Sequence, residues 1–362
     1  MPSSDPLAQV ETGEAWREFC RLLEEAGAVL QRDDLGLDTF DKAEGLRYLA
    51  RLTQNGLLSF LEAPGPRHPA FLSMPSHCGF GLDNPDNVYS SASVDPALEY
   101  RITGTRGTIR YLSFAAQNQN FARPERITGG AGHLDHTDLE IDDGGTFTVI
   151  ASQDEHPGNW LRLAPDTSMV LVRQTFALPT EVPAALEIEC LGVDDPPPML
   201  EPRAVPNQLL GGAMYAIGAS SWFADWVAPW RAEPNQLHFP DPEHHRLVGG
   251  DPNIVFQLGY WALEPDEALI VEATPPRCEY WNFQLGNIWA ECLDKRRQIS
   301  RNIATTTLEP DGSFRLVVAH ADPGHPNWID TAGHRHGIMG LRWVAAETHP
   351  PATTRVTPFP LS

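Results

Sequence analysis

Residues 311–343, DGSFRLVVAHADPGHPNWIDTAGHRHGIMGLRW, repeat in outline an earlier stretch, DGGTFTVIASQDEHPGNWLRLAPDTSMVLVRQ at 143–174. Both contain a Phe, an Asn-Trp pair and an Arg in the same order and at nearly equal spacing. Upstream, residues 97–114 align with residues 266–283 without a gap. A repeat of this length indicates a duplicated domain rather than a solenoid unit, so we expect the same module twice.

The repeated parts of the sequence have the pattern of β-strands. Between about residues 70 and 200, runs such as TIRYLSF and TFTVIAS alternate β-branched or aromatic residues with polar ones. Gly, Pro, Asp and Asn separate these runs, which is typical of an antiparallel sandwich or barrel. A second region of this kind extends from about 248 to 357. The predicted fold class is therefore mainly β, with two duplicated antiparallel modules.

Two other regions predict helices. Residues 11–62 place Leu and aromatic residues at helical spacing, with a second helix expected from about Phe40 to Leu61. Residues 203–237 contain GGAMYAIGASSWFADWVAPW, which predicts a partly buried helical insertion between the modules. The expected divisions are an N-terminal helical segment, a first sandwich, the insertion and a second sandwich, at 1–66, 67–200, 201–247 and 248–362.

Composition limits the possible partners. The chain has 362 residues, 41% of them hydrophobic, which is enough for a sizeable core. Its formal net charge of −22 disfavours nucleic acid and anionic membrane surfaces, because both attract cationic faces. No run of apolar residues is long enough to span a bilayer. We therefore expect a small-molecule partner, with a homo-oligomer left open.

The cysteines and the N-terminus predict a cytoplasmic location. The five cysteines, Cys20, Cys78, Cys190, Cys278 and Cys292, are odd in number and have no CxxC spacing. A disulfide framework or structural zinc site is therefore not expected, and a reducing compartment suits the chain. The first residues, MPSSDPLAQVETGEAW, lack the basic and apolar stretches of a secretory signal.

The segment YWNFQLGNIWAECLDKRRQISRN (280–302) contains an unusual row of polar residues. Tyr280, Asn282 and Gln284 alternate with large apolar residues, so a strand would place their polar groups on one face. The aligned positions of the first copy hold Ser113 and Ala115 in place of the two amides. Buried amides need partners, since an unpaired one costs about 1–3 kcal/mol. The row predicts either a ligand site or hydrogen bonding within the protein.

A second group of candidate residues lies in DPGHPNWIDTAGHRHGIMGLRW (322–343). His334 and His336 would share one strand face, and Asp330 is placed to orient an imidazole, as a general base requires. The alternative is a purely structural role, because Asn327 and Trp328 recur as an Asn-Trp pair in the first copy and are expected to be scaffold. A His-x-His pair also suits a metal, but a third ligand is not evident.

Two loops hold oxygen-rich groups. DNPDN (83–87) predicts a turn, with a hard-cation site as the alternative. GHLDHTD (132–138) predicts a solvated loop or, again, a cation site. No cofactor is expected, although a divalent cation is left open, and the sequence has no GxSxG, GxGxxG or P-loop motif.

The C-terminal third resembles a known family at YWNFQLGNIWAECLD, SRN, DGSFRLVVAHADPG and NWIDTAGHRHGIMGLRW. It is similar to a bacterial domain-of-unknown-function family numbered twelve-fourteen, with looser similarity in DNPDN and in WLRLAPDTSMVLVRQTF. The resemblance implies a double β-sandwich, jelly-roll-like fold and supplies no activity. The chain departs from the family pattern at Cys292, where Ser is expected, and at Lys295, where an aromatic residue is usual.

These observations lead to a functional hypothesis. We expect an enzyme that acts on a fairly apolar small molecule by acid–base hydrolysis or elimination, in a cleft of the second sandwich. The expected catalytic residues are His334, Asp330 and Tyr280. The expected substrate-binding residues are Asn282, Gln284, Trp281, Trp289, Trp222, Arg335 and His336. The alternatives are a non-catalytic module that binds a carbohydrate or lipid-like ligand, and an assembly subunit with exposed aromatics.

Overall fold

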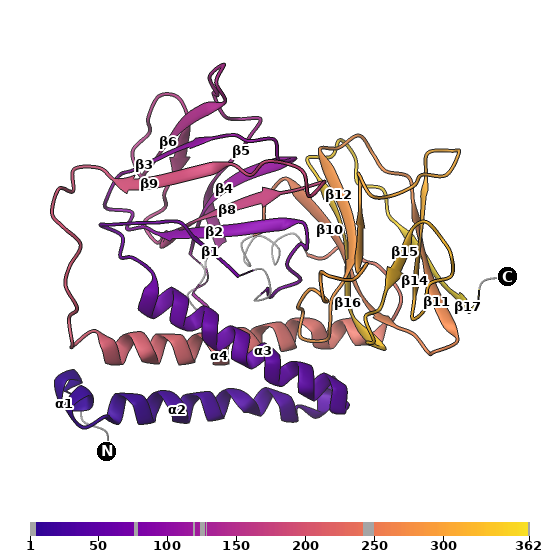
Figure 1. Ribbon diagram of the computed structural model, residues 1–362, viewed down its shortest axis with the longest axis horizontal. Helices are drawn as coiled ribbons and strands as arrows, with labels where there is room; N and C mark the ends of the chain where they lie inside the picture. The colour runs from indigo at the N-terminus through magenta and orange to yellow at the C-terminus, as the bar shows by residue number, and fades with distance from the viewer. Residues whose placement is uncertain are drawn as a thin grey trace.

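The computed structural model describes residues 5–75, 79–118, 120–123, 127, 129–241 and 250–360 of the chain. Within these residues the chain forms two β-sandwiches that lie side by side above a layer of helices (Figure 1). The mainly-β class, the N-terminal helical segment and the helix between the sandwiches are as predicted from the sequence. The expected boundary between residues 247 and 248 lies outside the described residues, and so does Cys78.

The first sandwich consists of sheets with strand orders β1-β2-β8-β4-β5 and β7-β6-β3-β9. Neighbouring strands are antiparallel except β6 and β7, which are parallel. The strands are β1 (Leu72–Ser73), β2 (Asn87–Ser93), β3 (Tyr100–Thr105), β4 (Tyr111–Asn118), β5 (Gly129–Asp135), β6 (Thr146–Ser152), β7 (Trp160–Arg162), β8 (Met169–Thr175) and β9 (Ala185–Cys190).

The second sandwich repeats this topology with orders β10-β16-β12-β13 and β15-β14-β11-β17. Its one parallel pair, β14 with β15, is equivalent to β6 with β7. The strands are β10 (Ile254–Ala262), β11 (Glu267–Ala273), β12 (Tyr280–Leu285), β13 (Ser300–Asn302), β14 (Phe314–Ala319), β15 (Trp328–Asp330), β16 (His336–Val344) and β17 (Thr353–Pro358). Apart from β1, each strand of the first sandwich has a counterpart in the second.

The strand register is also duplicated. Ser113 of β4 lies opposite Arg173 of β8, and at the equivalent place Asn282 of β12 lies opposite Arg342 of β16. The two sandwiches therefore share a scaffold in which different polar residues occupy equivalent positions.

The recurring Asn-Trp pair is part of that scaffold. Asn159 Nδ2 donates to the carbonyl of Thr148 at 3.0 Å, and Asn327 Nδ2 donates to the carbonyl of Arg315 at 3.0 Å. Each Asn thus ties the start of a short parallel strand to its neighbouring strand.

The helices form a layer that covers both sandwiches on one side (Figure 1). They are α1 (Pro6–Glu11), α2 (Glu14–Ala26), α3 (Thr39–Leu57) and α4 (Val205–Val227), with short turns η1 (Gly27–Gln31), η2 (Asp33–Leu35), η3 (Leu58–Glu62) and η5 (Ala228–Ala232). Asp38 caps α3 in a reciprocal capping box with Asp41, which fixes where the helix begins. No helix in the described part of the chain is long and apolar enough to cross a membrane.

The alternation of residues along β12 decides which side faces the core. Trp281, Phe283 and Leu285 belong to the core of the second sandwich, while Tyr280, Asn282 and Gln284 lie on the outer face. That outer face is nevertheless buried, because the first sandwich and the helices cover it.

Candidate functional site

The polar row of β12 binds the turn formed by residues 83–87, which precedes β2 of the first sandwich. The Tyr280 hydroxyl donates to Asp86 Oδ2 at 2.5 Å, and Asn282 Nδ2 donates to Asn84 Oδ1 at 2.9 Å. Gln284 Nε2 donates to the carbonyl of Asp83 at 2.9 Å. The row therefore joins the two sandwiches through hydrogen bonds within the protein, which was one of the two predicted roles.

Arg342 completes this contact from the neighbouring strand β16. Its guanidinium donates to Gln284 Oε1, to the carbonyl of Leu82 and, at 3.4 Å, to Asn282 Oδ1. The group also lies over the Phe256 ring, 4.9 Å from its centroid. Burial lowers the pKa of Arg342, and the nearby Tyr and Asp side chains oppose that shift. A buried cation of this kind needs the full set of acceptors that surrounds it.

Lys295 and Cys292 also contact this turn. Lys295 Nζ lies 3.0 Å from Asp83 Oδ2, and the backbone N–H of Cys292 donates to Asp83 Oδ1 at 3.2 Å. Asn302 Nδ2 donates to Asp86 Oδ2 at 2.8 Å. The 83–87 segment is thus a turn, as expected, whose side chains anchor it on the other sandwich.

A reciprocal contact is made by the second sandwich on the first. The turn before β10 contains Asp251, followed by Pro252 just as Asn84 is followed by Pro85. Asp251 accepts from Ser113 Oγ at 2.7 Å and from the Tyr111 hydroxyl at 3.2 Å. Tyr111 and Ser113 are equivalent to Tyr280 and Asn282, so each sandwich receives the turn of the other.

Two basic residues surround Asp251. His133 Nε2 lies 3.0 Å from Asp251 Oδ1, and Arg173 lies 4.0 Å from Oδ2. Burial alone would raise the pKa of Asp251, but His133, Arg173 and Ser113 together hold it far below its ordinary value. His133 lies on β5 and Asp135 is buried, so the predicted solvated loop at 132–138 is wrong for this part. The turn at 251–253 and the last residues of β5 meet because the two sandwiches pack together.

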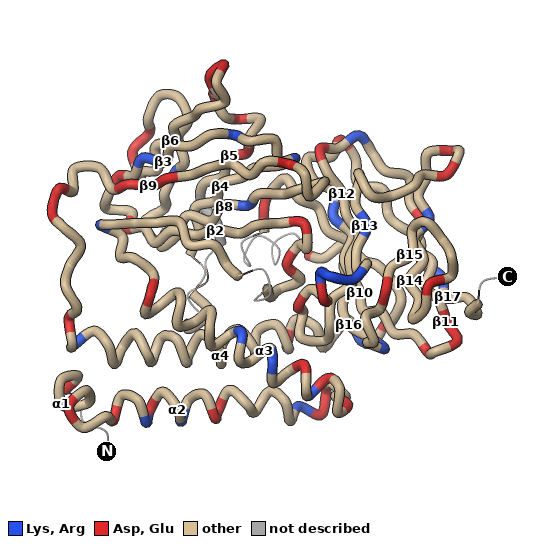
Figure 2. The backbone as a smooth tube through the Cα atoms, in the orientation of Figure 1, with Lys and Arg blue, Asp and Glu red and all other residues tan. Residues whose placement is uncertain are grey.

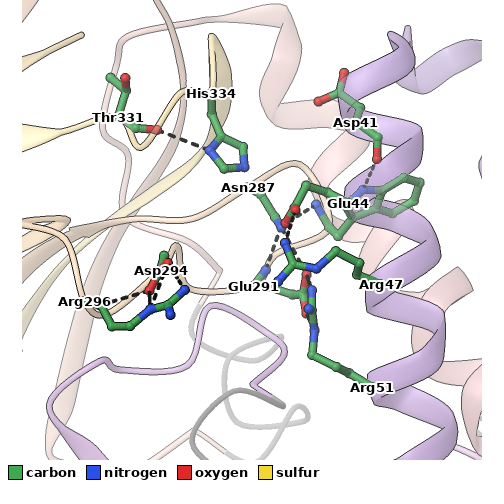
Figure 3. Close-up of polar contacts among 11 residues, drawn as sticks. Asp41, Glu44, Arg47, Arg51, Asn287, Glu291, Asp294, Arg296, Thr331 and His334 are labelled. Atoms are coloured by element: carbon green, nitrogen blue, oxygen red, sulfur yellow. Dashed lines mark hydrogen bonds and ion pairs between the residues drawn. The ribbon is translucent and has the colours of Figure 1, made fainter. Parts of the chain in front are cut away.

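The structure does not bring Asp330 to His334. Asp330 pairs with Arg297 at 3.0 Å and accepts from the backbone N–H of Ala332. His334 Nδ1 lies 3.2 Å from the carbonyl of Thr331 (Figure 3). Asp330 therefore does not orient the imidazole of His334, and the predicted pairing of the two residues is wrong.

His334 instead packs against the start of α3. Its ring meets the Phe40 ring edge-on, with centroids 4.9 Å apart, and only 8% of the residue is exposed. Nε2 has no hydrogen-bond partner among the described residues, and burial lowers the pKa of the imidazole. His334 is thus a mainly neutral, buried side chain at a helix–sandwich contact.

His336 takes part in a different set of polar contacts. Its Nε2 lies 3.2 Å from Asp41 Oδ2, and its Nδ1 lies 2.5 Å from the Tyr260 hydroxyl. Burial acts against ionisation of Asp41, but His336 and the backbone N–H of Asp38 lower the pKa of that carboxyl below its ordinary value. Burial raises the pKa of Tyr260 to about 12, so the phenol keeps its proton. With a proton on Nε2, the imidazole accepts the Tyr260 hydroxyl at Nδ1.

A second buried polar group lies beside α3. Arg51 Nε and Nη2 donate to the two oxygens of Glu291 at 2.7 and 2.6 Å, and Asn287 Nδ2 donates to the same carboxylate at 3.0 Å (Figure 3). Burial raises the pKa of Glu291 in spite of Arg51. This bidentate pair holds the helix against the loop after β12.

The three tryptophan residues predicted to bind substrate lie in different parts of the structure. Trp281 is inside the second sandwich, stacked on Phe314 with centroids 4.6 Å apart, so its expected role as a pocket wall is wrong. Trp289 is buried under α3 and donates Nε1–H to the carbonyl of Asp41 at 2.8 Å. Trp222 lies on α4, partly buried against the core beneath the helices. Arg335 is exposed and pairs with Glu264.

A cavity of about 270 Å³ opens between the helices and the first sandwich. Its walls come from the end of α3, from η3 and the segment after it, from β2, the start of β8 and residues 120–121, and from Tyr215 of α4. The side chains that line it are Asn55, Leu58, Ser59, Phe60, Ala63, Pro64, Ala70, Leu72, Met74, Ser91, Ala92, Ser93, Asn120, Phe121, Ser168, Met169 and Tyr215. None of the residues predicted from the sequence as site residues is among them.

Comparisons with known proteins show what the chain is similar to. A family model described as a protein of unknown function, DUF1214, matches residues 268–347. The crystal structure of an uncharacterized protein from Burkholderia cenocepacia is 39% identical, with a TM-score of 0.93 over 97% of this chain and 99% of that chain. The chain belongs to the same family as this Burkholderia protein, and residues 268–347 match the DUF1214 model. The VPA0106 protein from Vibrio parahaemolyticus is 11% identical, with a TM-score of 0.48 over 85% of this chain and 98% of that chain. Among curated proteins, none matches the sequence.

The part of the chain that matches the DUF1214 model extends from β11 to just beyond β16. It therefore contains the polar row of β12, Arg342 and both His334 and His336, but none of the residues that line the cavity. Within the described residues of the chain, no group of three or more His, Cys, Asp or Glu is arranged to hold a metal ion.

Sequence reasoning missed Asp41, Tyr260 and the cavity. Asp41 has one sequence signal, the Asp38–Asp41 spacing of a capping box, but that signal predicts a helix start and not a partner for His336. The cavity residues come from segments far apart in the sequence, so no local pattern identifies them.

Proposed function

We propose that this protein binds a small, mainly apolar molecule in the cavity between its helices and its first sandwich. The cavity supports this proposal because its volume, about 270 Å³, is near the lower end of the range of roughly 300–1,000 Å³ found for ligand pockets. Its walls combine aliphatic and aromatic side chains with a few hydroxyl and amide groups, as ligand pockets do.

The helical turn at one wall adds support. Residues Leu58–Glu62 form a π-helical turn directly after α3, and three of them, Leu58, Ser59 and Phe60, line the cavity. Turns of this type are rare and are found often at functional sites.

Closing the cavity tests this proposal. Ser93→Phe places a ring on the wall formed by β2, whereas Thr148→Phe places the same ring on an exposed position of β6. With 1-octanol as the probe in isothermal titration, we expect wild type and Thr148→Phe to bind, and Ser93→Phe to bind at least about tenfold more weakly. Equal binding by all three proteins would show that the probe sits elsewhere and would refute the proposal.

The linked side chains of Asp41, His336 and Tyr260 favour a second candidate function, an enzyme that works by acid–base hydrolysis or elimination. In this candidate Asp41 orients the imidazole of His336, and Tyr260 supplies the hydroxyl that exchanges a proton with Nδ1. Hydrolysis of p-nitrophenyl butyrate is the probe reaction. His336→Gln and Tyr260→Phe would each lower the rate by about 10²-fold or more, while Arg277→Gln, at an exposed position, would not. Unchanged rates in both variants would exclude this candidate.

A further inference from the structure

We infer that the cavity selects uncharged ligands: a mainly apolar molecule with one hydroxyl, carbonyl or amide group, in preference to a carboxylate or an ammonium. This inference rests on the proposed binding function and specifies the ligand class.

The first reason is the chemistry of the lining. None of the described residues that line the cavity carries a charge. The polar ones are serines, asparagines and a tyrosine, each able both to donate and to accept hydrogen bonds. A neutral hydroxyl or amide can therefore be satisfied there, whereas a charged group placed among these walls would lose its hydration without gaining an opposite charge.

The second reason is that the nearest basic residue on α3 already has an acidic partner. Arg51 lies one helical turn before Asn55, and its guanidinium makes the bidentate contact with Glu291 at 2.7 and 2.6 Å. A ligand carboxylate that used Arg51 would have to displace Glu291, which is itself buried and held by Asn287. The surface adds to this effect, because the chain carries a formal charge of −22 and acidic residues occur on both sandwiches and the helices (Figure 2).

The third reason concerns the buried polar groups of the cavity. Asn55 is 3% exposed and Tyr215 is 7% exposed, whereas Ser59, Ala70 and Ser168 are exposed, so the amide and the phenol are at the protected part of the lining. A ligand oriented by them would place its polar group inside and its hydrocarbon along the walls.

The backbone contact of α3 with α4 holds these two residues in place. A Cβ on Gly56 would lie 2.3 Å from the carbonyl oxygen of Gly212, so the two helices cross too closely there for any residue larger than glycine at position 56. Asn55 directly precedes this crossing, and Tyr215 follows it within one turn of α4. The backbone that carries these two polar side chains is thus held in place before a ligand binds, and such preorganisation favours selective binding.

A matched series of eight-carbon probes tests the inference on the full-length protein. The probes are 1-octanol, octanamide, octanoate and octylammonium, measured by isothermal titration at pH 8. We expect 1-octanol and octanamide to bind at least about tenfold more tightly than either ion. Asn55→Leu should weaken octanamide about tenfold, whereas Asn207→Leu, an exposed position on α4, should leave it unchanged.

The outcomes separate the two proposals. Octanoate or octylammonium binding as tightly as 1-octanol, with loss of both in Ser93→Phe, would overturn the selectivity and leave the binding function standing. If none of the four probes binds, the proposed binding function itself fails. Should Asn55→Leu unfold, Tyr215→Phe provides the second variant, and an unchanged preference for octanamide in it would count against the inference.

Discussion

Asn282 of β12 and Asn84 of the turn before β2 are hydrogen-bonded side chain to side chain, with Nδ2 of the first 2.9 Å from Oδ1 of the second. The contact joins the second sandwich to the first, and both residues are buried. Asn84 Oδ1 also accepts from the backbone N–H of Asp86 at 3.0 Å, so one amide orders the turn and the interface together. The equivalent contact in the other direction is Ser113 with Asp251.

Asn282→Ala should therefore destabilise the protein by about 1–3 kcal/mol, because it leaves buried groups of Asn84 and Arg342 with fewer partners. Urea unfolding followed by tryptophan fluorescence measures this change. Asn207→Ala, at an exposed position of α4, is the control and should change the free energy of unfolding by no more than about 0.5 kcal/mol. Equal stabilities of the two variants would mean that the interface does not depend on this amide.

Asp251→Asn should destabilise the protein in a pH-dependent way. The folded pKa of Asp251 is lowered, so its contribution is fully present above the ordinary value near pH 3.9 and is lost as the pH falls toward the folded value. Each unit of lowering corresponds to about 1.4 kcal/mol. Urea unfolding at intervals from pH 7 to pH 3 should show a large difference from wild type at pH 7 that narrows below about pH 4. A difference that stays constant over this range would contradict the assignment.

His334→Phe should reduce the loss of stability at mildly acidic pH. Burial lowers the folded pKa of His334, so the unfolded chain binds the proton more readily, and wild type loses stability as the pH falls below about 6.5. Phe removes that site and adds an apolar ring beside Phe40. Between pH 8 and pH 5, the free energy of unfolding of the variant relative to wild type should rise. The rise should be up to about 1.4 kcal/mol for each unit by which folding lowers the pKa of His334.

The control for this measurement is Thr148→Phe, which adds the same ring at an exposed position of β6 and removes no titrating group. It should follow the wild-type dependence on pH. If the free energies of unfolding of wild type and His334→Phe changed in parallel with pH, the imidazole would titrate alike in the folded and unfolded chains, which would contradict this prediction.

Gly56→Ala should destabilise the protein by about 1–3 kcal/mol, since the added Cβ would lie 2.3 Å from the carbonyl oxygen of Gly212 and force α3 and α4 apart. Gly27 is the matched control: its φ of −63° suits any residue, and nothing lies within 4 Å of an added Cβ. Gly27→Ala should be neutral or stabilising by about 0.4–1 kcal/mol. Thermal unfolding distinguishes the two, and equal melting temperatures would argue against a close helix crossing.

The sequence by itself determined the duplication, the strand pattern and the outward face of β12. The strand pattern and the outward face depend on local periodicity, because apolar residues at every second position specify a strand and its buried side. The repeated order of Phe, Asn-Trp and Arg could be read because equivalent strands keep equivalent side chains, as Asn159 and Asn327 do.

Only the tertiary structure decided what each polar residue contacts. The polar row of β12 was visible in the sequence, but its partners precede β2, and Asp41, the partner of His336, lies near the N-terminus of the chain. Asp330 and His334 are close in sequence, yet Arg297 and Phe40 occupy the space around them. The physical reason is that hydrogen bonds and apolar contacts act over a few ångströms in space. Their partners are therefore set by how sheets and helices pack, which no local pattern encodes.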